Sequence, residues 1–253
     1  MENTQPEEKA EGKKRDFLLP ASILIAALIV SISLVYNAGK KTGEGTNVPA
    51  VAGTGDAIQP SPVNMKAITA DDHIQGDMNA PVKLVVFSDL ECPFCKQFHY
   101  TLAQATQVYG SKIAWVFRHS PIDQLHPKAR KEAEASECAA DQKGNDGFWK
   151  FVDAVFAVTP SNNGLDPAEL PKIAGTIGLD VAKFNACLSS GKFTAKVEAQ
   201  RQDAIAAGGG GTPYTVVIAK DGKTTFVVSG AYPFTSSVPG SPSVKAAIDQ
   251  ALQ

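Results

Sequence analysis

Apolar residues beyond position 63 follow two patterns, short continuous runs and repeats at helical spacing. Residues 80–89 (APVKLVVFSD) form a continuous run, which is typical of a strand buried on both faces. Gly110 suits the end of a helix, and residues 112–117 form the next apolar run. Between the two runs lies one helix face, made of Phe94, Phe98, Leu102, Ala105 and Tyr109. This strand–helix–strand order predicts a right-handed parallel crossover.

The rest of the chain completes an α/β pattern. Strands are predicted at 213–219 and 224–230, on either side of the turn signal Asp221-Gly222, and a last helix carries Val244, Ile248 and Leu252 on one face. Five helices are predicted before them, at 127–142, 147–157, 166–177, 180–189 and 192–207, with breaks at Gly144, Pro160, Gly178 and Gly191. This order predicts a four- or five-stranded mixed sheet with helices on both faces and a helical insertion.

An uncharged apolar stretch lies near the start of the chain. Residues 17–36 hold no charge, and a helix of that length spans roughly 30 Å, the thickness of a bilayer core. The cations at 13–15 precede it, which favours a cytoplasmic N-terminus and a domain outside the cytoplasm. A cleaved signal peptide is the alternative, although its apolar core is usually only about 7–15 residues long. A buried soluble helix is a third interpretation.

These patterns divide the chain into four parts. A linker rich in Gly, Pro, Thr and Ala follows the apolar stretch, and its flexible residues would reach roughly 30 Å. The predicted parts are a cytoplasmic tail (1–16), a transmembrane anchor (17–36), a flexible linker (37–62) and a globular domain (63–253) with its helical insert at about 120–207. The predicted location is the cell membrane, with a single span and the domain in the periplasm or at the cell exterior.

Composition and charge exclude one class of function. The hydrophobic fraction is 43%, which is enough for a core, and the formal net charge is −2. A dedicated nucleic-acid binder needs a basic surface to neutralise phosphates, so that class is disfavoured. No motif indicates a flavin, a quinone or another cofactor, and none is expected.

Cys92 and Cys95 are the strongest chemical signal, in the stretch FSDLECPFCKQFHY (87–100). Cys92 falls where the N-cap of a helix would be, and Pro93 falls at the first helical position, which proline suits. The Cys92 sulfur would face free backbone N–H groups and the positive end of the helix dipole, both of which stabilise a thiolate. Cys95, one turn on and more buried, would resolve the mixed disulfide formed at Cys92. Pro93 and Phe94 are expected to contact the substrate.

Two other interpretations of the cysteine pair are weaker. A zinc site usually needs four ligands, but there is no second CxxC, and only His99 stands near Cys95 at a useful spacing. No metal is therefore expected. A purely structural disulfide between residues two apart would constrain almost no chain.

Several stretches together resemble the DsbA-like, thioredoxin-fold family of exported thiol–disulfide oxidoreductases. They cover roughly residues 68–230 in the family's order: GDMNAPVKLVVFSDLECPFCKQF, VFRHSPIDQLHPKARKEAEASECAADQ, FWKFVDAVF, FNACLSSGKF and GTPYTVVI. The resemblance implies a thioredoxin-like fold, βαβ plus ββα, with a helical insertion. It also implies a cis bond between Thr212 and Pro213, in a loop that faces the CxxC, with the Thr212 backbone pairing with an extended substrate.

Two positions depart from the family pattern. The well-known oxidases of the family have a buried acid six residues before the first cysteine, where this chain has Val86. Asp89 and Glu91 stand nearer and could relay protons, although a solvent-exposed loop position is expected for each. The loop before Gly-Thr-Pro is Gly208-Gly209-Gly210 instead of apolar, which predicts a mobile loop.

The other cysteines and two histidines are secondary candidates. An exported location makes a Cys138–Cys187 disulfide the expected state, with two buried free thiols as the alternative. His119 and His126 follow a strand and could reach the active site, but surface or structural roles are expected. The helix that carries Phe148, Trp149, Phe151 and Phe156 is expected to pack in the core, and a groove for unfolded clients is the alternative.

Together these features predict a membrane-anchored oxidoreductase that introduces disulfides into exported proteins. Its expected partners are reduced exported proteins and a quinone-linked membrane protein that reoxidises it. The alternatives are a reductase or isomerase kept reduced by a membrane electron donor, and a non-catalytic chaperone on the same scaffold.

Overall fold

The structure is a computed structural model that describes residues 58–238 and 241–253. The predicted tail, the anchor at 17–36 and most of the predicted linker lie outside these residues. Within the described ranges, no helix is long and apolar enough to cross a membrane.

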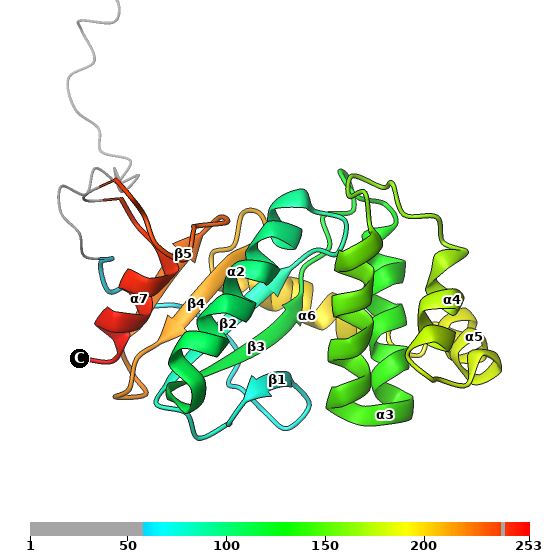
Figure 1. The fold of residues 1–253 in the computed structure, drawn as a ribbon, viewed down its shortest axis with the longest axis horizontal. Helices are drawn as coiled ribbons and strands as arrows, with labels where there is room; N and C mark the ends of the chain where they lie inside the picture. Colours follow the sequence, from blue (N-terminus) through cyan, green and yellow to red (C-terminus); the bar gives the residue numbers. More distant parts are fainter. Residues whose placement is uncertain (1–57, 239–240) are drawn as a thin grey trace, which may run out of the picture. The chain divides into compact units, whose positions relative to one another are not determined.

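Five strands form one mixed sheet (Figure 1). They are β1 (His73–Gly76), β2 (Val82–Ser88), β3 (Ile113–His119), β4 (Tyr214–Ile218) and β5 (Thr225–Ser229). The order across the sheet is β1-β3-β2-β4-β5. β2 and β3 run parallel, and every other neighbouring pair is antiparallel. The predicted mixed sheet is confirmed.

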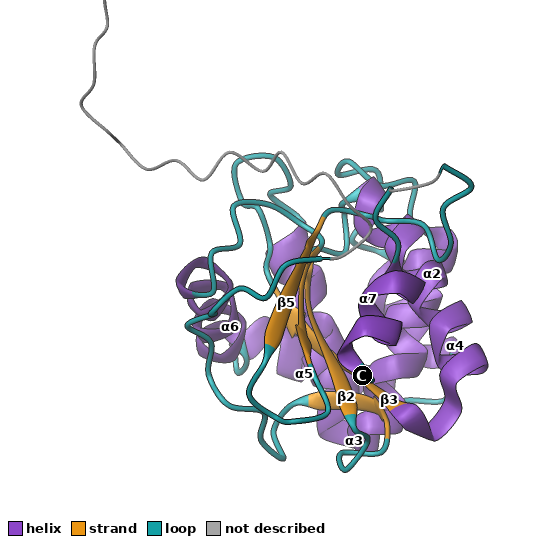
Figure 2. Cartoon of the chain, turned by 90° about the vertical axis from the view of Figure 1, so that its left-hand side faces the viewer, coloured by secondary structure: helices purple, strands orange, loops and turns teal. Residues whose placement is uncertain are grey.

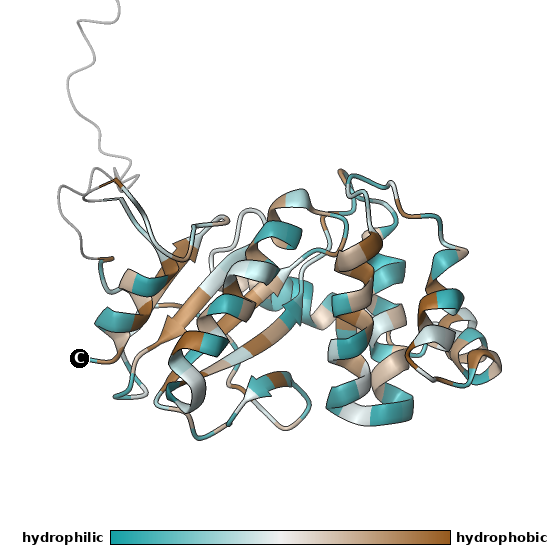
Figure 3. Ribbon diagram, in the orientation of Figure 1, coloured by the Kyte–Doolittle hydropathy of each residue, from teal (hydrophilic) through white to brown (hydrophobic). Residues whose placement is uncertain are grey.

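Side chains of the central strand β2 alternate between two apolar layers, as the two-residue period of a strand requires. Leu84 and Val86 join the core beneath α2 (Pro93–Tyr109) and α7 (Val244–Ala251), whereas Val85 and Phe87 pack toward α6 (Thr194–Ala206). Figure 2 shows α6 on one side of the sheet and α2 with α7 on the other. Figure 3 shows apolar positions both on the strands and on the helices that cover them.

The helical insert lies between β3 and β4. It consists of α3 (Ala129–Val158), α4 (Glu169–Thr176) and α5 (Val181–Ser190), followed by α6. Two separate helices were predicted where α3 stands, with a break at Gly144. The break is real, because Lys143 and Gly144 leave helical geometry, and Gly144 has a φ of 60° that glycine accepts without strain. The helical insertion is confirmed.

Two features near the start of the domain were not predicted. β1 is only four residues long, HIQG, and has no apolar run that would mark it as a strand. Residues 58–62, assigned to the linker from sequence, already lie against β5: Pro60 bridges to Phe226, and the Ser61 N–H donates to the Thr225 carbonyl.

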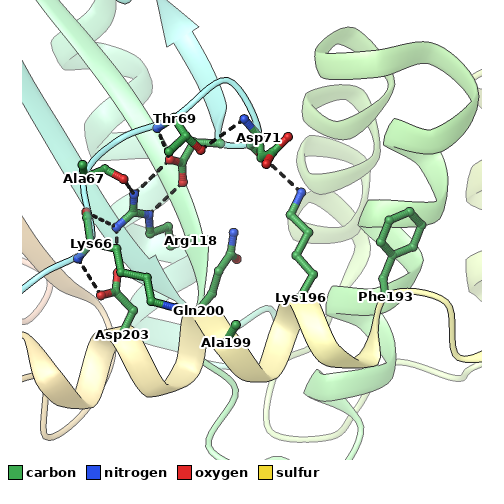
Figure 4. A pocket seen from close by; sticks show the side chains of 11 residues that line it. Lys66, Ala67, Thr69, Asp71, Arg118, Phe193, Lys196, Ala199, Gln200 and Asp203 are labelled. Carbon is green, nitrogen blue, oxygen red and sulfur yellow. Dashed lines mark hydrogen bonds and ion pairs between the residues drawn. The ribbon is translucent and has the colours of Figure 1, made fainter.

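A buried arginine ties this first segment to the sheet and to α6 (Figure 4). Arg118 of β3 forms ion pairs with Asp72 at 2.8 Å and with Asp203 at 2.7 Å. It also donates to the backbone carbonyls of Lys66 and Ala67. These groups line a pocket of about 520 Å³, but the guanidinium hydrogen bonds are all directed to protein atoms. The cluster is therefore a structural clamp.

Candidate active site

Cys92 and Cys95 lie where β2 gives way to α2. Cys92 is the N-cap residue of α2, and Pro93 begins the helix, as the sequence predicted. Both cysteines carry free thiols and are buried, with 5% of Cys92 and 1% of Cys95 exposed. Phe94 between them is 61% exposed. An aromatic ring in water beside a pair of thiols is a surface that an extended client chain can contact.

The two thiols differ in acidity. The pKa of Cys92 is lowered to about 6, first by a hydrogen bond from the Cys95 thiol and, against the effect of burial, by the backbone N–H groups of Cys95 and Phe94 and by Thr212. These N–H groups act on the Cys92 sulfur without forming a full N-cap hydrogen bond with it. Burial raises the pKa of Cys95 well above that of an ordinary thiol. Near neutral pH the outer sulfur is therefore a thiolate and the inner one a thiol.

The loop before β4 faces this pair. The Thr212–Pro213 peptide bond is cis, and the Cys92 thiol lies 3.6 Å from the Thr212 carbonyl oxygen. The Thr212 side chain lowers the pKa of both cysteines, although its buried hydroxyl makes no full hydrogen bond. The preceding glycines close the end of α6, since the Gly208 and Gly209 N–H groups donate to the Ile205 and Ala204 carbonyls.

Asp89 and Glu91 are buried, so the expectation that they are solvent-exposed loop charges is wrong: they are 1% and 0% exposed. The Asp89 carboxylate accepts hydrogen bonds from the backbone N–H groups of Glu91 and Ile122, both at 2.8 Å, and from the His126 ring at 2.9 Å. The Glu91 carboxylate accepts the Leu165 N–H at 3.3 Å. The bonds to Asp89 replace the water that its carboxylate loses, whereas one buried oxygen of Glu91 has no hydrogen-bond partner.

Two further residues of this cluster were missed or undervalued in the sequence. Glu132 of α3 is 2% exposed, and its pKa is raised to about 9 by burial first and then by the neighbouring Glu91 and Asp89. It is protonated at neutral pH. His126 is 6% exposed and contacts Asp89 instead of solvent. No local pattern marks Glu132, because a glutamate in a helix is ordinarily on the surface.

The remaining candidates have structural positions. His119 is 1% exposed and lies 3.3 Å from a Glu137 carboxylate oxygen. His99 pairs with Asp153 at 2.7 Å. No group of three potential metal ligands was found among the described side chains. The aromatic residues of α3 are buried in the main core, which supports core packing over a client groove: Phe148, Trp149, Phe151 and Phe156.

Cys138 of α3 and Cys187 of α5 are joined by a disulfide. We expect the double substitution of Cys138 and Cys187 by alanine to lower the free energy of unfolding by about 4 kcal/mol, because the bond closes a loop with a sequence separation of 49. Urea denaturation of the oxidised proteins measures this loss. The reduction potential of Cys92/Cys95 should stay unchanged, and a large shift in it would give the second bridge a redox role.

The acidity of Cys92 predicts a pH-dependent stability of the reduced protein. Its pKa of about 6 lies below that of an unfolded thiol, so the thiolate's contribution is complete above about pH 8.5 and is lost as the pH falls through 6. The raised pKa of Cys95 acts in the opposite sense, but only at higher pH. We expect the reduced protein to lose about 2–3 kcal/mol relative to the oxidised protein between pH 8 and pH 5. Parallel urea titrations of both forms check this difference, and a difference that does not change with pH contradicts it.

Comparisons with known proteins agree with this fold. A sequence model of a family described as thioredoxin (Thioredoxin_4) matches residues 69–225. The structure of Pseudomonas aeruginosa DsbA2 has a TM-score of 0.61 and 26% identity, over 74% of this chain and 97% of that one. Oxidised BdbD from Bacillus subtilis has a TM-score of 0.55 at 22% identity, over 64% and 87% of the two chains, which shows the fold alone.

The sheet order, the CxxC at a helix start and the cis-proline loop define a thioredoxin-fold protein. With the family match and the likeness to DsbA2, the chain belongs to the DsbA-like thioredoxin family.

Another group of sequence relatives carries the name of an ion antiporter. The Na(+)/H(+) antiporter NhaA 3 of Salinispora tropica is 29% identical over 194 residues, which is 76% of this chain and 28% of that protein. The chain thus spans about a quarter of the length of the curated relatives that it matches.

Proposed function

We propose that this protein is a thiol–disulfide oxidoreductase that introduces disulfides into exported proteins, with Cys92 and Cys95 as its redox pair. The observation that carries the proposal is the difference between the two sulfurs: an acidic one at the start of a helix and a buried one behind it. A thiolate stabilised in the reduced form makes the disulfide form a strong oxidant.

The reaction follows from the two acidities. A client thiolate attacks the Cys92 sulfur of the disulfide, and Cys95 leaves and takes up a proton because its pKa is high. A second client thiolate then attacks the client sulfur of the mixed disulfide. Cys92 leaves as a thiolate, which its low pKa favours, and the client gains a disulfide while the enzyme gains two electrons.

The substrate is expected to lie across Phe94 and the cis-proline loop. Phe94 offers exposed apolar surface next to Cys92, and Thr212 is only partly buried. An extended client segment placed there could pair with the Thr212 backbone as an added strand, which would hold its sulfur near Cys92. Such pairing uses main-chain groups and suits an enzyme with many clients.

The membrane anchor at 17–36 and the quinone-linked partner remain part of this proposal. The anchor rests on the uncharged stretch and its flanking cations. The partner rests on electron balance, because each client oxidised leaves two electrons on the enzyme. Membrane fractionation of the full chain, with and without residues 1–36, tests the anchor.

The decisive experiment is the equilibrium reduction potential of Cys92/Cys95 against glutathione. An oxidase should lie near about −120 mV, whereas a reductase should lie near about −270 mV. A value near the second figure would overturn the oxidative direction while leaving disulfide exchange intact. Absence of any reversible couple would favour the non-catalytic chaperone.

A further inference from the structure

A buried cluster of ionisable groups lies directly behind the redox pair. It contains Asp89 and Glu91 from the loop before α2, His126 from the loop before α3, and Glu132 from α3, each no more than 6% exposed. The reaction described above uses none of them. Burying ionisable groups costs folding free energy unless each group has a partner.

Asp89 connects this cluster to the sulfurs. Its backbone N–H lies 3.4 Å from the Cys95 sulfur, and its carboxylate lies 2.9 Å from Nδ1 of His126. One residue therefore contacts the inner cysteine and fixes the orientation of the imidazole. Nδ1 must donate to this carboxylate, which is an acceptor only.

Charge also couples His126 to the outer sulfur. Burial lowers the pKa of His126, but Asp89, the charge on Cys92 and Asn162 outweigh burial, so that its pKa is raised. The charge on Cys92 exists only in the reduced protein, because a disulfide has no thiolate. The oxidised and reduced forms thus present two different electric fields to one imidazole.

Among the ionisable groups of this cluster, His126 is the one whose charge can change when the disulfide is reduced. Glu132 already holds a proton at neutral pH. Lys128 is held by the Asn163 and Leu165 carbonyls. A histidine, in contrast, changes its charge in the physiological range.

We propose that His126 takes up a proton when the Cys92–Cys95 disulfide is reduced, and that the resulting imidazolium stabilises the Cys92 thiolate. The inference rests on the proposed redox function. Two client thiols lose two electrons and two protons in becoming a disulfide. One proton binds Cys95 as the internal bond breaks, and the other is divided between His126 and solvent. His126 is therefore a positioning residue. It acts through its effect on the Cys92 thiolate and does not touch the client.

The direct test compares the two redox states of the wild-type protein. NMR titration of the His126 ring should show proton affinity about three- to tenfold higher in the reduced form, because a charge appears nearby in a poorly screened setting. Equal affinities in the two forms would overturn the inference. A missing reversible couple would instead overturn the proposed function, and the two failures are therefore distinguishable.

A substitution tests the reciprocal effect. His126→Asn keeps an N–H donor near the position of Nδ1, toward Asp89, but cannot carry a charge. Because coupling between two sites is reciprocal, the proton affinity of Cys92, followed by thiolate absorbance, should rise by the factor measured for His126. His73→Gln is the control, since His73 binds Glu137 through Nε2 at 2.9 Å and should leave Cys92 unchanged. Equal effects of both variants on Cys92 would contradict the inference, and if His126→Asn does not fold, the wild-type titration decides.

Discussion

Replacing either Cys92 or Cys95 by serine should abolish disulfide transfer to a reduced client, because neither variant can form the internal disulfide, and Cys95→Ser alone should trap a client that already carries a disulfide. Cys92 is the more exposed and more acidic of the two sulfurs and lies beside the cis-proline loop, so it receives the attack. In Cys95→Ser the Cys92 thiolate attacks a disulfide of the client, one client thiolate leaves, and the mixed disulfide accumulates because no Cys95 thiol can displace the client. Refolding of a reduced client measures the loss of transfer, and non-reducing gel electrophoresis after incubation with an oxidised client measures the trapping.

The two serine variants serve as controls for each other, because both remove one buried sulfur at the same turn. Urea denaturation of both variants measures their stabilities directly, so that a loss of activity can be separated from unfolding. A Cys92→Ser protein that still refolds a reduced client at the normal rate would remove this site from the activity and revive the chaperone interpretation.

Replacing Arg118 by methionine should cost about 3–5 kcal/mol of folding free energy, because it leaves Asp72 and Asp203 buried without their cation. The side chains of the three residues are each no more than 6% exposed, so water cannot compensate. The substitution also frees the carbonyls of Lys66 and Ala67. Urea denaturation of the oxidised protein measures the loss.

Arg130→Met is the matched control, since Arg130 also pairs with two carboxylates. Its partners Asp123 and Glu198 are 41% and 37% exposed, and such pairs contribute less than about 1 kcal/mol. Equal losses in the two variants would show that burial of the Arg118 cluster has no energetic consequence.

Local patterns predicted the sheet, the insert and the cysteine pair well. The strands at β2 to β5 are apolar runs bounded by turn residues, and Cys92-Pro93 is a helix start in sequence as in structure. The kink at Gly144 was also visible, because glycine marks it. These features depend on neighbours in the chain, which a sequence displays directly.

Features that depend on distant neighbours could not be predicted. β1 exists because its backbone pairs with β3, not because its four residues favour a strand. Asp89 was expected in solvent because nothing nearby shows that Ile122 and His126 will surround its carboxylate. The burial of Glu132 depends in the same way on how α3 packs against the active-site loop.

The first described residues of the domain bear on its solubility. An unpaired outer strand offers a row of hydrogen-bonding groups to any other chain, and natural proteins block such rows to avoid aggregation. Here Pro60 and Ser61 lie along β5, and the Thr225 hydroxyl donates to the Ser61 carbonyl. The domain thus keeps this edge of its sheet paired at Pro60 and Ser61, and truncation beyond residue 61 would expose it.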